Sequence, residues 1–282
     1  MSTVRQRARA VHQKITGYLP VSKMEEITYD DARSLGKENL PPQLIGTVVD
    51  YLTRFMVGMS IQKSFEVSLA GYIRRIKAKG KDTFQEDINN GRFIKDLLIG
   101  ISPDLDSVSI ALACRAAAYD VWARNPIEAL SSPEVDTITP NLLTCNNIKI
   151  MVDRGVTFLN RYGTVTDTGF TFGPNGYTNT VTSGDGDFLT ETSLWDFKAL
   201  SASPNAKDTL QVLMYWIMGK HSGNPIYDKV ETIGLFNPRK NIAYICHTSN
   251  ISDATISAVE KYVIGYYFEE EKQNSGANKP LQ

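Results

Sequence analysis

The chain has 282 residues, 42% of them hydrophobic and 22% charged, with a formal net charge of −1. Such a composition is ordinary for a globular protein and supplies enough apolar material for a sizeable core. The balanced charge excludes a global basic field of the kind that attracts nucleic acid non-specifically, although local basic groups remain compatible with binding it.

Cysteine usage and the N-terminal residues indicate a reduced compartment. The cysteines are odd in number and far apart, so no disulfide framework follows, and each is expected to be a small buried residue: Cys114, Cys145 and Cys246. The arginine-rich run 5–9 leads into an amphipathic stretch, which argues against a signal peptide. No apolar run approaches the ~18 residues that a membrane span needs. We therefore expect a cytoplasmic protein with no membrane partner.

The first 150 residues are expected to be helical. Apolar residues recur at helical spacing from Val4 to Leu19, and a polar connector follows over 29–39. The pair Pro41-Pro42 is expected to start a strong helix with an apolar face that reaches Met56. Further helical patterns cover 65–78, 93–99 and 107–123.

The pattern changes near residue 156, where aromatic residues and threonine alternate with glycine, as is typical of strands and turns. A helix is expected over 208–219 with Asp208 as its cap, and strands over 230–236 and 242–246 flank a turn at 237–241. Ser252 or Asp253 is the candidate cap of a last helix that reaches about residue 268. The polar segment 269–282 is expected to be a flexible tail.

Acidic and basic side chains gather in the segment 184–198, which is expected to form two short strands joined by a polar turn. Alternate side chains of a strand share a face, so Asp196 and Lys198 point the same way while Phe197 points into the other layer. The turn would bring Asp187 back beside them. Two carboxylates suit a divalent ion such as Mg²⁺, and a neighbouring lysine can hold a water or a phosphate. Asp185 is a rival ligand, and Asp187 is preferred because it directly precedes an apolar pair.

The helix expected over 208–219 carries a second polar pair. Gln211 and Tyr215 stand one turn apart and therefore share a face. Taken in order, the two acids, the lysine and this Gln-x-x-x-Tyr pair resemble the active site of the PD-(D/E)XK nuclease superfamily, in its RecB-like and phage-exonuclease-like branch. The resemblance covers residues 156–252. Gly186 stands where the first motif of the family has a proline, a residue that is often replaced in these families.

The resemblance implies an α/β fold of the restriction-endonuclease-like type, with a mixed central sheet flanked by helices. It implies a helical N-terminal region, 1–150, packed on a nuclease core, 151–268. It also assigns five catalytic residues: Asp187, Asp196, Lys198, Gln211 and Tyr215. Asp187 and Asp196, with the backbone carbonyl of Phe197, would hold Mg²⁺, for which Mn²⁺ would substitute. Lys198 would orient the attacking water or balance charge in the transition state, Gln211 would position that water or the lysine, and Tyr215 would brace Gln211 or contact a phosphate.

The function that follows is Mg²⁺-dependent hydrolysis of phosphodiester bonds, with DNA as the partner and exonuclease action favoured. The alternative is a nuclease fold that no longer cuts and serves as a DNA- or protein-binding module. Some relatives carry an iron–sulfur cluster on four cysteines, and with three cysteines this chain is expected to have none.

Two helical carboxylates are candidates for completing the site, because the helix that precedes the sheet in this family often supplies one more acid. Asp50 lies in the more apolar helix and is the preferred further metal ligand, and Asp120 is the other candidate. Asp50 could equally be paired with Arg54 at the i+4 position, and both interpretations stay open. The basic run at 74–81 has two readings as well, a solvated helix end or, less favoured, an arm that contacts phosphates.

Overall fold

A computed structural model of the protein describes residues 2–13, 17–80 and 82–266. The chain divides into two compact units, one formed by Met1–Tyr29 with Leu159–Gln282 and the other by Asp30–Phe158. The sequence placed the boundary at residue 150 and the first residues with the helical region, whereas here they join the unit that contains the sheet. The predicted flexible tail, 269–282, lies outside the described residues.

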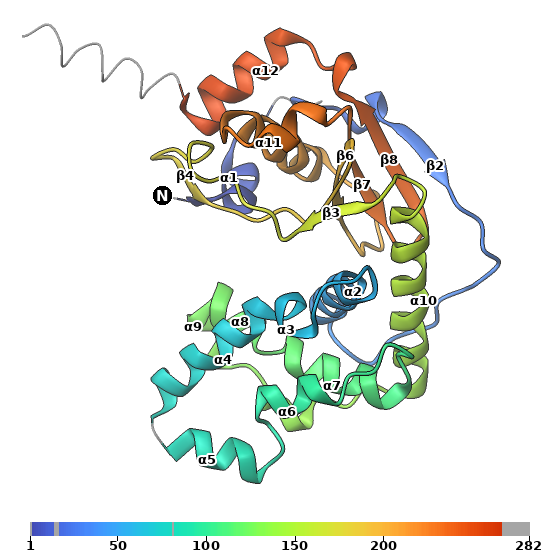
Figure 1. The fold of residues 1–282 in the computed structure, drawn as a ribbon, viewed down its shortest axis with the longest axis vertical. Helices are drawn as coiled ribbons and strands as arrows, with labels where there is room; N and C mark the ends of the chain where they lie inside the picture. The colour runs from blue at the N-terminus through green and yellow to red at the C-terminus, as the bar shows by residue number, and fades with distance from the viewer. Residues whose placement is uncertain (1, 14–16, 81, 267–282) are drawn as a thin grey trace, which may run out of the picture. The chain divides into compact units, whose positions relative to one another are not determined.

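The first unit is built on a mixed six-stranded sheet (Figure 1). Its strands lie in the spatial order β2 (Glu25–Thr28), β8 (Ile242–His247), β7 (Thr232–Asn237), β6 (Ser193–Phe197), β5 (Phe188–Thr190) and β3 (Val165–Thr168). Strands β6 and β7 run parallel, and every other neighbouring pair is antiparallel. The protein is therefore a mixed α/β structure with an open sheet flanked by helices, and both predicted hairpins are present.

Helix α11 (Ala206–His221) packs on one face of this sheet and is apolar around most of its circumference, as a helix in the interior must be. Its cap differs from the prediction. Asn205 is the N-cap, and Asp208 is the third residue of a capping box, in which it accepts a hydrogen bond from the backbone of Asn205. The opposite face of the sheet carries aromatic contacts, among them Trp195 with Tyr162 and Phe197 with Phe236.

The N-terminal residues pair and pack with other elements of the same unit. Strand β1 (Ser2–Thr3) pairs in parallel with β4 (Val181–Ser183), and α1 (Val4–Ala10) packs against α11. After the 3₁₀ turn Val21–Lys23, β2 forms the edge of the sheet beside β8. The predicted helix from Val4 ends at Ala10. At the other end of the unit, Ser252 caps α12 (Asp253–Val259), which continues as a π-helix over Glu260–Ile264.

The second unit is helical. Its helices, listed in chain order, are α2 (Pro42–Met56), α3 (Ile61–Ser64), α4 (Glu66–Lys79), α5 (Asp82–Asn89), α6 (Ile94–Ile99), α7 (Ser107–Ala117), α8 (Asp120–Arg124), α9 (Pro126–Ala129) and most of α10 (Leu142–Leu159). The helix predicted over 107–123 is broken at residues 118–119 into α7 and α8. In the part of the chain that the structure describes, no helix combines the length and apolar character needed to cross a membrane.

Two cations of the basic run at the end of α4 form ion pairs within this unit. Arg75 is buried and pairs with Asp87 and Glu134, and Lys79 pairs with Glu134 at 2.6 Å. These cations are therefore part of an ion-pair network that joins α4 to α5 and to the residues before α10. The solvated reading of the run is wrong for Arg75, which is only 3% exposed. Its ion pairs leave Arg75 poorly placed for a phosphate.

Candidate active site

The two predicted metal ligands lie opposite each other where the β5–β6 pairing ends, Asp187 directly before β5 and Asp196 within β6. The register pairs Phe188 with Trp195 and Leu189 with Leu194, so the next step of the antiparallel ladder sets Asp187 opposite Asp196. The carboxylate of Asp187 also reaches along the strand, where its Oδ2 accepts a hydrogen bond of 2.7 Å from the backbone N–H of Phe197. The first acid is thereby tied to the strand that carries the second acid.

Asp196 and three further polar side chains form one connected hydrogen-bonded network. The ammonium of Lys198 lies 2.8 Å from Oδ2 of Asp196 and donates to Oε1 of Gln211 at 3.3 Å. The amide nitrogen of Gln211 lies 3.2 Å from Oδ1 of Asp196 and 2.6 Å from the phenolic oxygen of Tyr215. The structure therefore brings together Asp196, Lys198, Gln211 and Tyr215 from a strand, the loop after it and a helix, as the sequence predicted.

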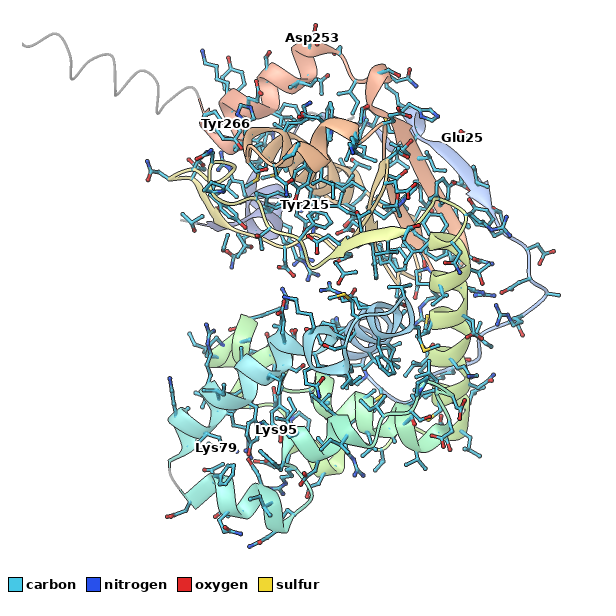
Figure 2. The ribbon with its side chains drawn as sticks, in the orientation of Figure 1. Glu25, Lys79, Lys95, Tyr215, Asp253 and Tyr266 are labelled. Atoms are coloured by element: carbon cyan, nitrogen blue, oxygen red, sulfur yellow. The ribbon has the colours of Figure 1, made fainter. Side chains whose placement is uncertain are left out.

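Burial is the main influence on the pKa values of Asp196 and Tyr215 in this hydrogen-bonded network. Asp196 is 1% exposed, and removal from water is the largest influence on its carboxyl group, raising its pKa well above the ordinary value. The Lys198 ammonium works in the opposite direction, and the charge of Asp187 raises the pKa further. Burial likewise raises the pKa of the Tyr215 phenol, so this hydroxyl stays protonated at neutral pH. Tyr215, which is labelled in Figure 2, is itself buried.

Asp187 and Asp196 offer the oxygen donors that a divalent cation prefers. Oδ2 of Asp196 is buried, and among the described residues it has the Lys198 ammonium as its ion-pair partner but no hydrogen bond. Two carboxylates that repel each other, one of them desolvated, are hard oxygen donors whose charge a cation would neutralise. Within the described part of the chain no group of three or more acidic, histidine or cysteine side chains has metal-binding geometry. The remaining ligands would have to be carbonyl oxygens, substrate or water.

A residue that the sequence did not suggest holds the loop after Lys198. The N–H of Lys198 extends the ladder to the carbonyl of Phe236, and the next residue of β7 is the buried Asn237. Its amide nitrogen donates to the carbonyl of Leu200 at 2.8 Å, and its oxygen accepts from the backbone of Arg239. Asparagine at the start of a turn predicts the second bond, but only the tertiary structure places Leu200 within reach of the first.

The other acids considered from the sequence lie in different surroundings. Asp185 is half-buried in the loop before β5, two residues ahead of Asp187. Asp50 and Asp120 belong to the helical unit. Asp50 is held by Arg54 through two bonds of 2.9 and 2.8 Å, so the i+4 ion pair proposed as the alternative is present. Asp120 pairs with Arg124 and accepts a hydrogen bond from the buried phenol of Tyr51. A metal-binding role for Asp50 stays a prediction.

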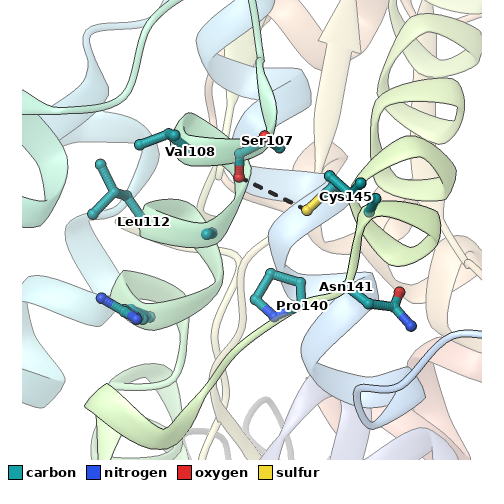
Figure 3. Close-up of a pocket in the computed structure, with 9 residues that line it drawn as sticks. Ser107, Val108, Leu112, Pro140, Asn141 and Cys145 are labelled. Atoms are coloured by element: carbon teal, nitrogen blue, oxygen red, sulfur yellow. Dashed lines mark hydrogen bonds between the residues drawn. The ribbon is translucent and has the colours of Figure 1, made fainter.

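The helical unit contains a hollow of a different chemical character (Figure 3). It measures about 590 Å³ and lies between α7 and the start of α10. Aliphatic groups such as Val108, Leu112 and Leu142 line it, Arg115 is its one charged lining residue, and the thiol of Cys145 contacts the carbonyl of Ser107 at 3.8 Å. Such a lining provides no acid–base pair. All three cysteines of the protein are free and buried, as predicted.

Comparison of the chain with protein families, with curated proteins and with solved structures gave no match. Any assignment of function therefore depends on the geometry of the site and on the resemblance of its residues to a known arrangement.

Proposed function

We propose that this protein is a metal-dependent nuclease with a restriction-endonuclease-like core, which hydrolyses phosphodiester bonds of DNA and acts as an exonuclease. The observation that carries the proposal is the connected network of Lys198, Asp196, Gln211 and Tyr215, buried on one sheet face beside Asp187. An ordinary surface hairpin would have solvated carboxylates, whereas here a carboxylate is taken out of water and surrounded by donors. Burying such groups is costly, and perturbed acids of this kind gather at functional sites.

In this mechanism Asp187, Asp196 and the carbonyl of Phe197 would hold Mg²⁺, with Mn²⁺ as a substitute. The bound ion would polarise the scissile phosphate and lower the pKa of a water. In the overall hydrolysis the water oxygen would bond to phosphorus as one ester P–O bond breaks; the water would give up one proton, and the leaving oxygen would take one up. Lys198, with its positive charge close to Asp196, would orient the water and balance negative charge that develops on the phosphate. Gln211 would keep Lys198 in place, and Tyr215 would keep Gln211 in place.

A second candidate is a nuclease fold that binds DNA or protein without cutting it. The contact of 2.8 Å between Lys198 and Asp196 favours this reading, because the ammonium already supplies the positive charge that a cation would bring. The two readings differ in what metal does to the folded state. Binding of Mn²⁺ to the native protein raises its free energy of unfolding by RT ln(1 + [metal]/Kd) and with it the melting temperature, whereas a neutralised site without metal affinity gives no such rise.

The test is cleavage of end-labelled linear DNA and closed circular DNA with Mg²⁺ or Mn²⁺. Wild type is compared with Lys198→Ala and with the matched control Lys220→Ala, which removes an exposed lysine at the end of the same helix that carries Gln211. We expect degradation of linear DNA only, abolished in Lys198→Ala and retained in Lys220→Ala.

Each other outcome has a defined meaning. Cutting of circles would make the protein an endonuclease that uses the same residues. Full activity of purified Lys198→Ala would refute the assignment of the site. Absence of cutting together with stabilisation by Mn²⁺ would keep the metal site and reject DNA as the substrate. Absence of both effects would leave the binding module as the function.

A further inference from the structure

Asp187 lies just outside β5, where two further backbone hydrogen bonds continue the β3–β5 pairing. The register pairs Thr168 with Phe188. The N–H of Gly169 then donates to the carbonyl of Asp187 at 3.1 Å, and the N–H of Gly186 donates to the carbonyl of Phe170 at 2.9 Å. The backbone on both sides of the first acid is therefore bound to the segment 169–170.

The side chain of Phe170 covers Gly186. A methyl group at Gly186 would overlap three ring atoms of Phe170, Cζ, Cε1 and Cε2, far inside van der Waals contact. An aromatic ring laid over a glycine on the neighbouring strand packs in the volume that the missing side chain leaves. A proline at this position would meet the same ring, and it would lack the N–H that donates to Phe170. The glycine in place of the family's proline is thus matched to this ring.

The ring cannot move away freely, because it is buried among other aromatic side chains. Phe170 is 2% exposed and makes edge-on contacts with Phe172 at 5.9 Å, Tyr227 at 6.1 Å and Tyr215 at 6.2 Å between ring centroids. The contact with Tyr215 connects it to the helix that holds Gln211. Phe170 therefore lies against the backbone next to one predicted metal ligand and against the tyrosine that completes the hydrogen-bonded network.

We propose that Phe170 is the positioning residue of Asp187: its ring, packed on Gly186 and Tyr215, sets the distance of that carboxylate from the buried Asp196 and Lys198. The relevance to metal binding and catalysis rests on the proposed function, whereas the positioning itself is a property of the folded chain. The hydrogen bond from the Phe197 N–H to Oδ2 of Asp187 reports this position directly, with no need for metal or substrate.

The experiment measures hydrogen exchange of the Phe197 amide by NMR in wild type, Gly186→Ala, Phe170→Leu and the double variant. Leucine lacks all three ring atoms that the new methyl group would meet, so the double variant removes the clash. The Leu194 amide in the same strand is the internal control, and Phe65→Leu, a fully buried phenylalanine of the helical unit, is the control for loss of core packing. The Kd for Mn²⁺ is measured on the same proteins.

We expect Phe197 exchange to accelerate about tenfold or more in Gly186→Ala, since a hydrogen bond to a charged group is lost, with Leu194 exchange unchanged. The double variant should exchange more slowly at Phe197 than Gly186→Ala does. It should also bind Mn²⁺ with a lower Kd than Gly186→Ala. Were Gly186→Ala not to fold, Phe170→Leu should still accelerate Phe197 selectively. Additive damage in the double variant, or an unchanged Phe197 amide in Gly186→Ala and Phe170→Leu, would overturn the proposal. If the double variant restores slow exchange at Phe197 but wild type binds no Mn²⁺, the positioning role of Phe170 stands and the proposed function is rejected.

Discussion

The ammonium of Lys198 lies 2.8 Å from Oδ2 of Asp196, and the carboxylate of that pair is almost completely removed from water. The lysine side chain is 16% exposed and the aspartate side chain 1%, so water can partly solvate the ammonium but not the carboxylate. Away from water, a lone carboxylate costs far more free energy than an ion pair, so the loss of either partner leaves the other with an uncompensated charge.

Replacement of Lys198 by Met therefore has a stability effect that metal should reverse. Without metal, we expect Lys198→Met to lower the free energy of unfolding by about 3 kcal/mol at neutral pH, because the buried carboxyl of Asp196 then either stays charged without its cation or has to take up a proton. A divalent ion supplies the missing charge, so Mn²⁺ should raise the melting temperature of this variant more than that of wild type. Thermal unfolding with and without Mn²⁺ tests both statements. Equal Mn²⁺ shifts in the two proteins would contradict a shared cation position.

Gln211 is expected to act by holding its neighbours in place. Gln211→Ala removes the hydrogen bonds to Asp196, Lys198 and Tyr215, and we expect cleavage of linear DNA to slow by about 10- to 100-fold, in the range of a displaced catalytic group. Single-turnover cleavage separates this from weaker DNA binding. The exposed glutamine of α5, in Gln85→Ala, is the control and should leave cleavage unchanged. Loss of DNA affinity with an unaltered single-turnover rate would argue for substrate contact.

Asn237 offers a pair of variants that separates the loop contact from the turn contact. Asn237→Asp keeps the oxygen that accepts from Arg239 and loses the N–H group that donates to Leu200, whereas Asn237→Ala loses both. We expect both variants to slow cleavage about tenfold, because both lose the N–H group that donates to Leu200, and Asn237→Asp to be less stable than Asn237→Ala by about 1–3 kcal/mol, because its buried carboxylate would face that carbonyl oxygen. Urea denaturation and cleavage assays measure the two effects. Normal activity of Asn237→Asp would mean that the loop after Lys198 needs no such clamp.

The helical unit has an acid-sensitive ion pair at its start. Arg154 donates to both oxygens of Asp31 at 2.7 Å, and this guanidinium holds the pKa of the Asp31 carboxyl well below its usual range. A carboxyl whose pKa is lowered by folding contributes stability above its unfolded pKa of about 3.9, and that contribution is lost as the pH falls toward the folded value. The difference in unfolding free energy between wild type and Asp31→Asn should therefore be about 1–3 kcal/mol at pH 6 and shrink steadily below pH 4.

Urea denaturation across this pH range tests the prediction for Asp31. The control is Asp228→Asn, whose side chain is 66% exposed and pairs with Lys220 at the surface. Such a pair contributes little, so its difference from wild type should stay small at every pH. A difference for Asp31→Asn that does not depend on pH would show that the ion pair is not its origin.

Local patterns were enough to predict the parts of the site that lie close together in the chain. The acids at 187 and 196 lie on the two arms of a hairpin with a two-residue turn, and Gln211 and Tyr215 are one helical turn apart. The geometry of each element therefore sets which side chains share a face. The hairpin of β7 and β8 was predicted for the same reason. A mixed α/β fold follows from such elements, because strands and helices with complementary apolar faces have few ways to pack.

Contacts between distant segments could not be predicted in this way. Helix α10 carries asparagine, threonine and β-branched residues that disfavour helices, and burial of its apolar residues outweighs that preference. Strand β2 has two glutamates in four residues and becomes a strand because β8 leaves an edge to pair with. The ring of Phe170 over Gly186 and the bond from Asn237 to Leu200 join residues 16 and 37 positions apart. The residue types of the site and their order are thus determined by the sequence, while their burial and mutual support arise only when the folded chain excludes water from them.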